Sequence, residues 1–177
     1  MLFLQAEPPK HTPVEFVAKY YSYAKETELK TGIDARFILA QAALESGWGA
    51  SAPGYLFFGI KAGRDILEHK RQLVRTREVH VNADKQFPEI LSIRKLKSGK
   101  YEYIVRDWFR KYNSPDESFS DYARLLLENK RYAKALKEKG DPYRFADAIA
   151  KAGYASHPYY AVTLKNVIRM IETLIEN

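Results

Sequence analysis

The chain has 177 residues, 46% of them hydrophobic, which is enough for one domain with a buried core. A formal charge of +7 and a pI near 9.4 favour an anionic partner: nucleic acid, an acidic membrane surface or a charged polysaccharide. The lack of cysteine excludes disulfides, thiolate metal sites and a cysteine nucleophile, and no apolar stretch approaches the roughly 20 residues that span a bilayer.

Capping residues predict where the first two helices begin. Thr12 and Glu15 form a capping pattern that predicts a helix running to about Gly32. Asp34 caps a second helix, and Gly47 is suited to end it. The high apolar content of this second helix predicts burial on most sides, as the central helix of the domain.

A different pattern follows over residues 55–112. Apolar and polar residues alternate over 73–81 and 101–105, with β-branched and aromatic types enriched, which is typical of strands. A turn is predicted at 98–100. We therefore expect a small, basic antiparallel sheet or hairpin lobe inserted in one helical domain that covers residues 1–177. No signal peptide is recognised in residues 1–11, and we expect that segment to be flexible.

Helices resume in the last third of the chain. Ser114 and Glu117 predict a second capping box. The apolar face of that helix is expected to contain Phe119, Tyr122, Leu126 and Leu127. Asp141 opens the next helix, which ends near Gly153, and the final helix is expected to begin around Pro158.

Glu45 is the unusual residue of the central helix. It lies in the last turn, where the negative end of the helix dipole and desolvation both favour the protonated carboxyl group, so we expect a raised pKa. A general acid requires that property. On position alone, a helix-end glutamate that is exposed to water or paired with a lysine is the more common case. Trp48, between Gly47 and Gly49, supplies an indole that can shield a carboxyl group or stack on a sugar.

Four blocks of sequence carry a family resemblance. They are ILAQAALESGWG at 38–49, SAPG at 51–54, FGIK at 58–61 and AGYASHPYYA at 152–161. Together they resemble the signature of bacterial glucosaminidases of glycoside hydrolase family 73, over about residues 12–176. The resemblance implies an α+β, lysozyme-like fold, mainly helical, with a small antiparallel β-lobe flanking a cleft. It also implies that Glu45 is the catalytic acid.

Three departures from the family pattern stand out. Tyr55 and Leu56 occupy positions where the family commonly has two asparagines, and His157 stands where an aspartate is usual. The β-lobe is longer than expected, chiefly over residues 82–100, which would rebuild one wall of the cleft.

Glycoside hydrolysis usually needs a second carboxylate, unless the acetamido group of the substrate takes its part. The candidates in the β-lobe are Glu78, Glu89 and Glu102. Glu78 lies in a Thr-x-Glu pattern that resembles the family's second acidic residue, so we choose it, with Glu102 second. An ordinary strand glutamate paired with Arg75 or Arg77 is the alternative reading.

Aromatic residues are the candidates for substrate contact. Tyr154 matches a tyrosine of the family's second block, and the resemblance implies a hydroxyl that faces the sugar; a buried aromatic behind a helix end is the alternative. Possible sugar platforms are Trp48, Phe57, Phe58, Tyr159 and Tyr160. The four histidines lack metal-ligand spacing, so we predict no metal and no other cofactor.

The predicted function is hydrolysis of the β-1,4 bond between N-acetylglucosamine and N-acetylmuramic acid in peptidoglycan, at the cell wall, by a monomer. A muramidase or lytic transglycosylase on the same fold is the close alternative. A non-catalytic wall-binding module is a rival from another class. Nucleic acid is not expected as a partner, because no helix-turn-helix, RNA-binding or zinc-finger motif occurs.

Overall fold

The computed structural model describes residues 11–155 and 157–176. Its longer elements are α1 (Pro13–Thr31), α2 (Ala35–Ser46), β1 (Arg71–His80), β2 (Glu89–Lys95), β3 (Tyr101–Arg110), α3 (Pro115–Glu128), α4 (Pro142–Lys151) and α5 (Tyr160–Glu176). Short 3₁₀ turns are η1 (Pro53–Tyr55), η2 (Glu68–Lys70), η3 (Lys130–Tyr132) and η4 (Ala135–Glu138). The segment expected to be flexible lies outside the described residues except for His11, whose ring meets Tyr20 edge-on.

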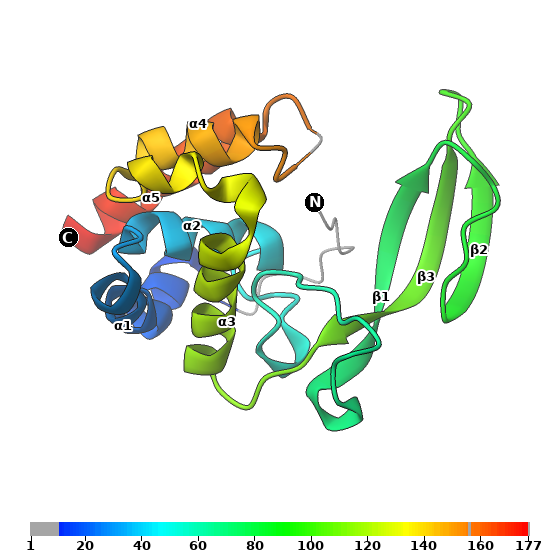
Figure 1. The fold of residues 1–177 in the computed structure, drawn as a ribbon, viewed down its shortest axis with the longest axis horizontal. Coiled ribbons are helices and arrows are strands. Elements are labelled where there is room, and N and C mark those ends of the chain that lie inside the picture. The colour runs from blue at the N-terminus through cyan, green and yellow to red at the C-terminus, as the bar shows by residue number, and fades with distance from the viewer. Residues whose placement is uncertain (1–10, 156, 177) are drawn as a thin grey trace.

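The central position of α2 is confirmed. It packs against α1, α4 and α5 and is buried along nearly its whole length (Figure 1). The Asp34 side chain accepts a hydrogen bond from the Arg36 backbone at 2.8 Å, and Gly47 ends the helix in a left-handed conformation. Burial of an apolar helix on all sides makes α2 the rigid element from which its C-terminal residues project.

The predicted caps of α1 and α3 both form, in different ways. Thr12 accepts from the Glu15 backbone while the Glu15 carboxylate accepts from the Thr12 backbone, which is a complete capping box. In α3 the Ser114 hydroxyl accepts from the Glu117 backbone. The Glu117 carboxylate instead accepts from the Asn113 backbone, one residue beyond the cap.

The cap of α1 should contribute measurably to the stability of the fold. Thr12→Ala should lower the free energy of unfolding by about 1 kcal/mol, because it leaves a backbone N–H of the first turn without its acceptor. Thr163→Ala is the matched control, since that hydroxyl is exposed within α5 and only donates to the Tyr159 carbonyl oxygen. Urea denaturation of both variants measures the difference. Equal losses would contradict a specific capping contribution.

One member of the expected apolar face of α3 is not part of it. Phe119, Tyr122 and Leu126 are buried, whereas Leu127 is 39% exposed. Leu127 follows Leu126 directly, and consecutive helical residues point about 100° apart. The prediction for Leu127 is therefore wrong.

The sheet has three antiparallel strands in the order β1-β3-β2. The predicted turn is confirmed, with the Gly99 backbone donating to the Leu96 carbonyl oxygen at 2.9 Å. β2 was not predicted as a strand. A register shift between Ile90 and Ser92 breaks its alternation, so its sequence loses the period of two.

Figure 1 shows the sheet projecting from the helical body, with β1 the nearest strand and the connection at its base. The base is held by a small apolar cluster of Leu56, Phe109 and Tyr112, with Val74 packed against it. The main core lies between the helices. Within the described residues, the helices are too short or too polar to cross a membrane.

Candidate active site

Glu45 lies in the last turn of α2 and is only 8% exposed. Figure 1 shows that this end of α2 points toward the side on which the sheet stands. The next residues, Gly47, Trp48 and Gly49, all have left-handed backbones, with φ of 59°, 56° and 79°. A tryptophan rarely adopts that conformation, so Trp48 is a site of local backbone strain.

The turn after Glu45 is held by specific hydrogen bonds. The Trp48 backbone donates to the Ala43 carbonyl oxygen at 2.8 Å. The Ser46 hydroxyl donates to the Ala42 carbonyl oxygen and accepts from the Gly49 backbone. The indole of Trp48 meets the ring of Phe16 edge-on at 5.7 Å. These contacts keep the strained turn in one conformation and leave the indole half-buried beside the end of α2.

Three tyrosines interact electrostatically with Glu45: Tyr122 on α3, Tyr154 on the segment between α4 and α5, and Tyr160 at the start of α5. The rings of Tyr154 and Tyr160 stack at 5.7 Å, and the Tyr160 hydroxyl donates to Gln41 at 2.7 Å. Burial, and then the charges of their neighbours including Glu45, raise the pKa of Tyr122, Tyr154 and Tyr160 well above the ordinary 10.0. The three hydroxyl groups therefore stay protonated at neutral pH, as hydrogen-bond donors in the surroundings of Glu45.

Glu78 is held by a lysine from the segment before the sheet. Lys61 Nζ lies 2.8 Å from Glu78 Oε1 and 2.8 Å from Asp107 Oδ2. Desolvation works against the ammonium group, but the two carboxylates outweigh it and raise the pKa of Lys61. The alternative pairing of Glu78 with Arg77 does not form, because Arg77 binds Glu102.

Register places the two acid candidates on opposite faces of the sheet. Glu78 is paired with Tyr103 and Glu102 with Val79, and successive residues of a strand alternate between faces. Glu102 is clamped by Arg77 and Arg94, which lower its pKa.

The Glu78 face is the one turned toward the segment that follows Glu45. Gln72 and Val74 share this face with Glu78, because residues two apart on a strand point the same way. Gln72 donates to the Pro53 carbonyl oxygen at 2.6 Å, and Val74 packs on the cluster that contains Leu56. Both of those contacts lie a few residues beyond α2.

The aromatic residues predicted to stack on sugars differ in how far they are buried. Trp48 is half-buried and Tyr159 is 67% exposed, so both rings are accessible to a ligand. Phe58 is 4% exposed and stacks in parallel on Tyr122 at 4.0 Å. Tyr160 is 1% exposed. Because Phe58 and Tyr160 lie in the core, as does Phe57, we assign them to packing behind the site and not to substrate contact.

The first departure from the family pattern has a structural counterpart. Tyr55 adopts a left-handed backbone with φ of 54°, a conformation that asparagine tolerates better than other residues with a side chain. Leu56 lies in the small apolar cluster under the sheet. The two positions therefore shape the link between helical body and sheet.

Sequence reasoning missed two members of the site. Lys61 closes the FGIK block, yet its role as a bridge appears only when Glu78 and Asp107 are brought to it from two strands. The sequence predicts Tyr122 only as part of the apolar face of α3. Its hydroxyl group, a polar group on a buried face, was the signal that could have indicated a role in the site. Among residues 11–155 and 157–176, the histidine and acidic side chains form no cluster that could hold a metal ion.

A helical body built around α2, with a small three-stranded antiparallel sheet attached, is the architecture of lysozyme-like glycoside hydrolases. Residues 21–173 match the family model "Glucosaminidase: Mannosyl-glycoprotein endo-beta-N-acetylglucosaminidase". The chain belongs to this glucosaminidase family.

Similar proteins agree with that assignment. The chain is 34% identical to the peptidoglycan hydrolase FlgJ of Vibrio cholerae, covering 90% of this chain and 44% of the relative. It thus spans less than half of that relative's length. Among solved structures, a peptidoglycan hydrolase mutant from Sphingomonas sp. A1 superposes with a TM-score of 0.69 at 32% identity, covering 92% of this chain and 98% of that one. A C-terminally truncated glycoside hydrolase domain of Salmonella typhimurium FlgJ gives a TM-score of 0.68 at 29% identity, covering 92% of this chain and 99% of that one.

Proposed function

We propose that this chain hydrolyses the β-1,4 bond between N-acetylglucosamine and N-acetylmuramic acid in peptidoglycan, with Glu45 as the general acid. The observation that carries the proposal is the position of Glu45, which is 8% exposed in the last turn of the central helix α2. The peptidoglycan hydrolases that the chain resembles support the substrate class. The net charge of +7 favours adsorption to the anionic wall, the place where we propose that the chain acts.

In the proposed reaction, Glu45 protonates the oxygen of the leaving sugar as the glycosidic bond breaks. Water supplies the hydroxyl group to the anomeric carbon, and its proton passes to a base, which restores the charge balance. Glu78, or the acetamido group of the substrate, assists at the anomeric carbon. Tyr154 donates its hydroxyl hydrogen toward the sugar, and Trp48 and Tyr159 supply ring surfaces.

Substitution of Glu78 and of Glu102, which lie on opposite faces of the sheet, should affect hydrolysis differently. Glu78→Gln should lower the hydrolysis rate by about 10²-fold, because the variant keeps the shape of the side chain but not its charge. Glu102→Gln is the control on the opposite face and should retain activity within about twofold, with some loss of stability. Release of reducing ends from purified walls measures both. Equal rates for the wild type and Glu78→Gln would indicate that the acetamido group acts in its place.

The bond that is cut is tested by product analysis. Purified peptidoglycan is incubated with the protein, the products are reduced with borohydride, and the new sugar ends are identified by mass spectrometry. Reduced N-acetylglucosamine ends are expected. Reduced muramic ends or anhydromuramic ends would identify a muramidase or a lytic transglycosylase instead, and no new ends together with saturable wall binding would identify a binding module.

A further inference from the structure

A cavity of about 660 Å³ lies beside β3, at the edge of that strand that faces away from β1. Along this edge, β2 pairs with residues Tyr101 to Arg106 of β3. Further along β3, Lys61 forms an isolated β-bridge with Phe109. The cavity opens between these two covering segments. Its walls come from residues 62–64 on one side, from 86–88 on the other, and from Arg71 and Trp108 on the sheet.

The cavity is cationic. Arg64 and Arg71 both line it, and neither makes an ion pair with a carboxylate of residues 11–155 or 157–176. The guanidinium of Arg71 lies 4.5 Å from the centre of the Trp108 ring, which orients it. Its Nε is buried without a hydrogen-bond acceptor in the described part of the chain. A guanidinium group that is held in one orientation and has an unpaired N–H donor can bind a carboxylate ligand.

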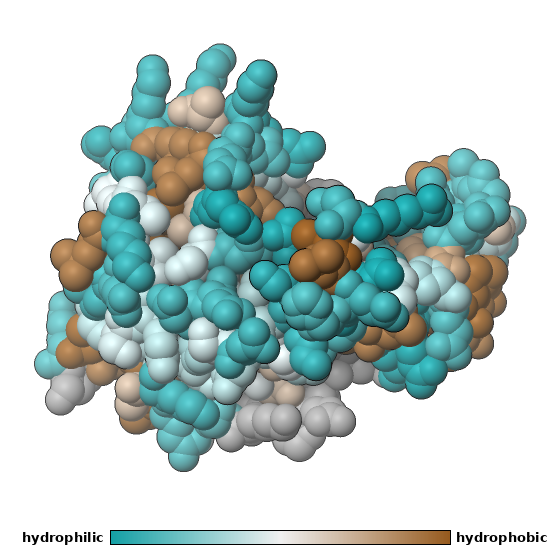
Figure 2. Space-filling model, turned by 60° about the horizontal axis from the view of Figure 1, so that its bottom comes forward, coloured by the Kyte–Doolittle hydropathy of each residue, from teal (hydrophilic) through white to brown (hydrophobic). Residues whose placement is uncertain are grey.

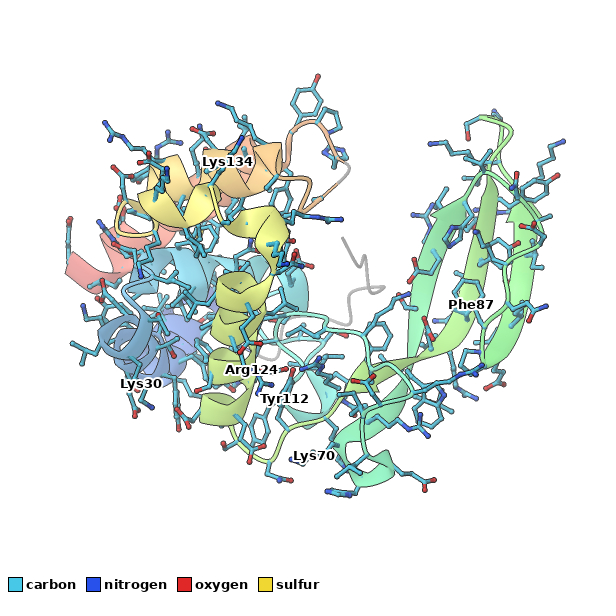
Figure 3. The ribbon with its side chains drawn as sticks, viewed as in Figure 1. Lys30, Lys70, Phe87, Tyr112, Arg124 and Lys134 are labelled. Atoms are coloured by element: carbon cyan, nitrogen blue, oxygen red, sulfur yellow. The ribbon has the colours of Figure 1, made fainter. Side chains whose placement is uncertain are left out.

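Aromatic rings form the rest of the binding surface. Trp108 and Phe87 are both half-buried, and Figure 3 places Phe87 over the strands. Phe87 belongs to the 82–100 region, the part of the β-lobe that is longer than the family pattern. Its ring centre lies 5.9 Å from Lys61 Nζ, and Lys61 holds Glu78. Phe87 thus lies between the cavity and Lys61, whereas Arg71 and Trp108 point to the sheet face opposite Glu78, because Trp108 pairs with Leu73 in the strand register.

We propose that this cavity binds a carboxylate of the peptide stem attached to the glycan strand, as a second contact outside the catalytic site. The inference rests on the proposed function, because peptidoglycan is the polymer that brings a glycan and acidic peptides together. Arg71 pairs with the carboxylate, Arg64 adds a second positive charge, and Trp108 and Phe87 pack against the aliphatic part of the stem. The contact selects strands that still carry their peptides.

The experiment uses three soluble ligands: a disaccharide-peptide with free carboxylates, the same compound with amidated carboxylates, and the disaccharide alone. The indole N–H resonance of Trp108 reports occupancy of the cavity, and the Trp48 resonance serves as a marker for the catalytic side. The acidic ligand should shift Trp108 in a saturable titration. Arg71→Gln should weaken that binding about tenfold, the loss expected for one charge-assisted hydrogen bond. Arg144→Gln, which removes an exposed arginine of α4, should not change it.

A second arm measures hydrolysis of intact walls and of strands stripped of peptides by an amidase. Arg71→Gln should raise KM for intact walls severalfold, leave kcat unchanged and leave the stripped strands unaffected. Equal binding of the acidic and amidated ligands, or displacement of the acidic ligand by an equal concentration of inorganic phosphate, would overturn the proposal. If the wild type hydrolyses no substrate, the proposed function fails, while the Trp108 titration still tests the cavity by itself.

Discussion

Glu45→Gln is expected to lower the rate of peptidoglycan hydrolysis by about 10³-fold while the protein still folds and binds the wall. Glutamine has nearly the same shape as a glutamic acid side chain but has no proton to give to the leaving oxygen. Because Glu45 is buried at the end of a rigid helix, the neutral amide adds no unpaired charge to the site. Wall binding and thermal unfolding should therefore stay close to the wild type.

Glu128→Gln is the matched control. It changes the last residue of another helix, α3, where the carboxylate is exposed. Its release of reducing ends should equal that of the wild type. If Glu45→Gln retained most of the activity in the same assay, Glu45 would not be the proton donor. A loss of activity accompanied by loss of wall binding and of the thermal transition would indicate misfolding instead.

Asp121→Ala is expected to lower the free energy of unfolding by about 3 kcal/mol. Asp121 is 8% exposed and joins α3 to the end of β3. Both of its oxygens accept from Arg110 at 2.7 Å, the Tyr112 hydroxyl donates to it at 2.7 Å, and Arg124 completes the network. Figure 3 shows Tyr112 and Arg124 together at this junction. Figure 2, in which the bottom of Figure 1 comes forward, shows a mainly hydrophilic surface with separate hydrophobic patches. Removal of the carboxylate leaves a partly buried guanidinium without its acceptor.

The pH dependence of this effect follows from the pKa of Asp121. Desolvation works against the carboxylate, but the hydrogen bonds from Tyr112, Arg124 and Arg110 outweigh it and hold the pKa below its ordinary value of 3.8. A group whose folded pKa is lowered stabilises the protein fully above the unfolded value and loses that effect as the pH falls through the folded value. The difference in free energy of unfolding between Asp121→Ala and the wild type should thus be largest at pH 7. It should disappear as the pH falls below 3.8.

Urea denaturation at pH 7 and in acid measures both parts of the prediction. Glu138→Ala is the control, because it removes an acidic residue from an exposed pair with Arg144 at 3.8 Å, which contributes at most about 1 kcal/mol. A loss for Asp121→Ala no larger than that of Glu138→Ala would show that the junction does not depend on this network. The network sets how the sheet joins the helical body. Asp121→Asn should therefore lower the rate of peptidoglycan hydrolysis by a larger factor than the loss of folded protein explains.

The sequence alone determined the parts of the molecule that depend on local chemistry. The caps of α1 and α2, the apolar content of α2 and the turn at Gly99 each lie within a few residues of the structure they specify. The position of Glu45 at the end of the central helix followed from the same local signals. The family blocks added the fold class, because they span both ends of the chain.

Only the tertiary structure decided which distant residues meet. Lys61 bridges Glu78 and Asp107, which are 17 and 46 residues away along the chain, and local periodicity carries no information about such pairs. Burial of Phe58 depends on Tyr122 in another helix, and the choice between Glu78 and Glu102 depends on strand register. Local signals in the sequence thus specified most of the elements and the place of Glu45 at a helix end. Packing between elements determined what surrounds Glu45, because those contacts form only when remote segments fold together.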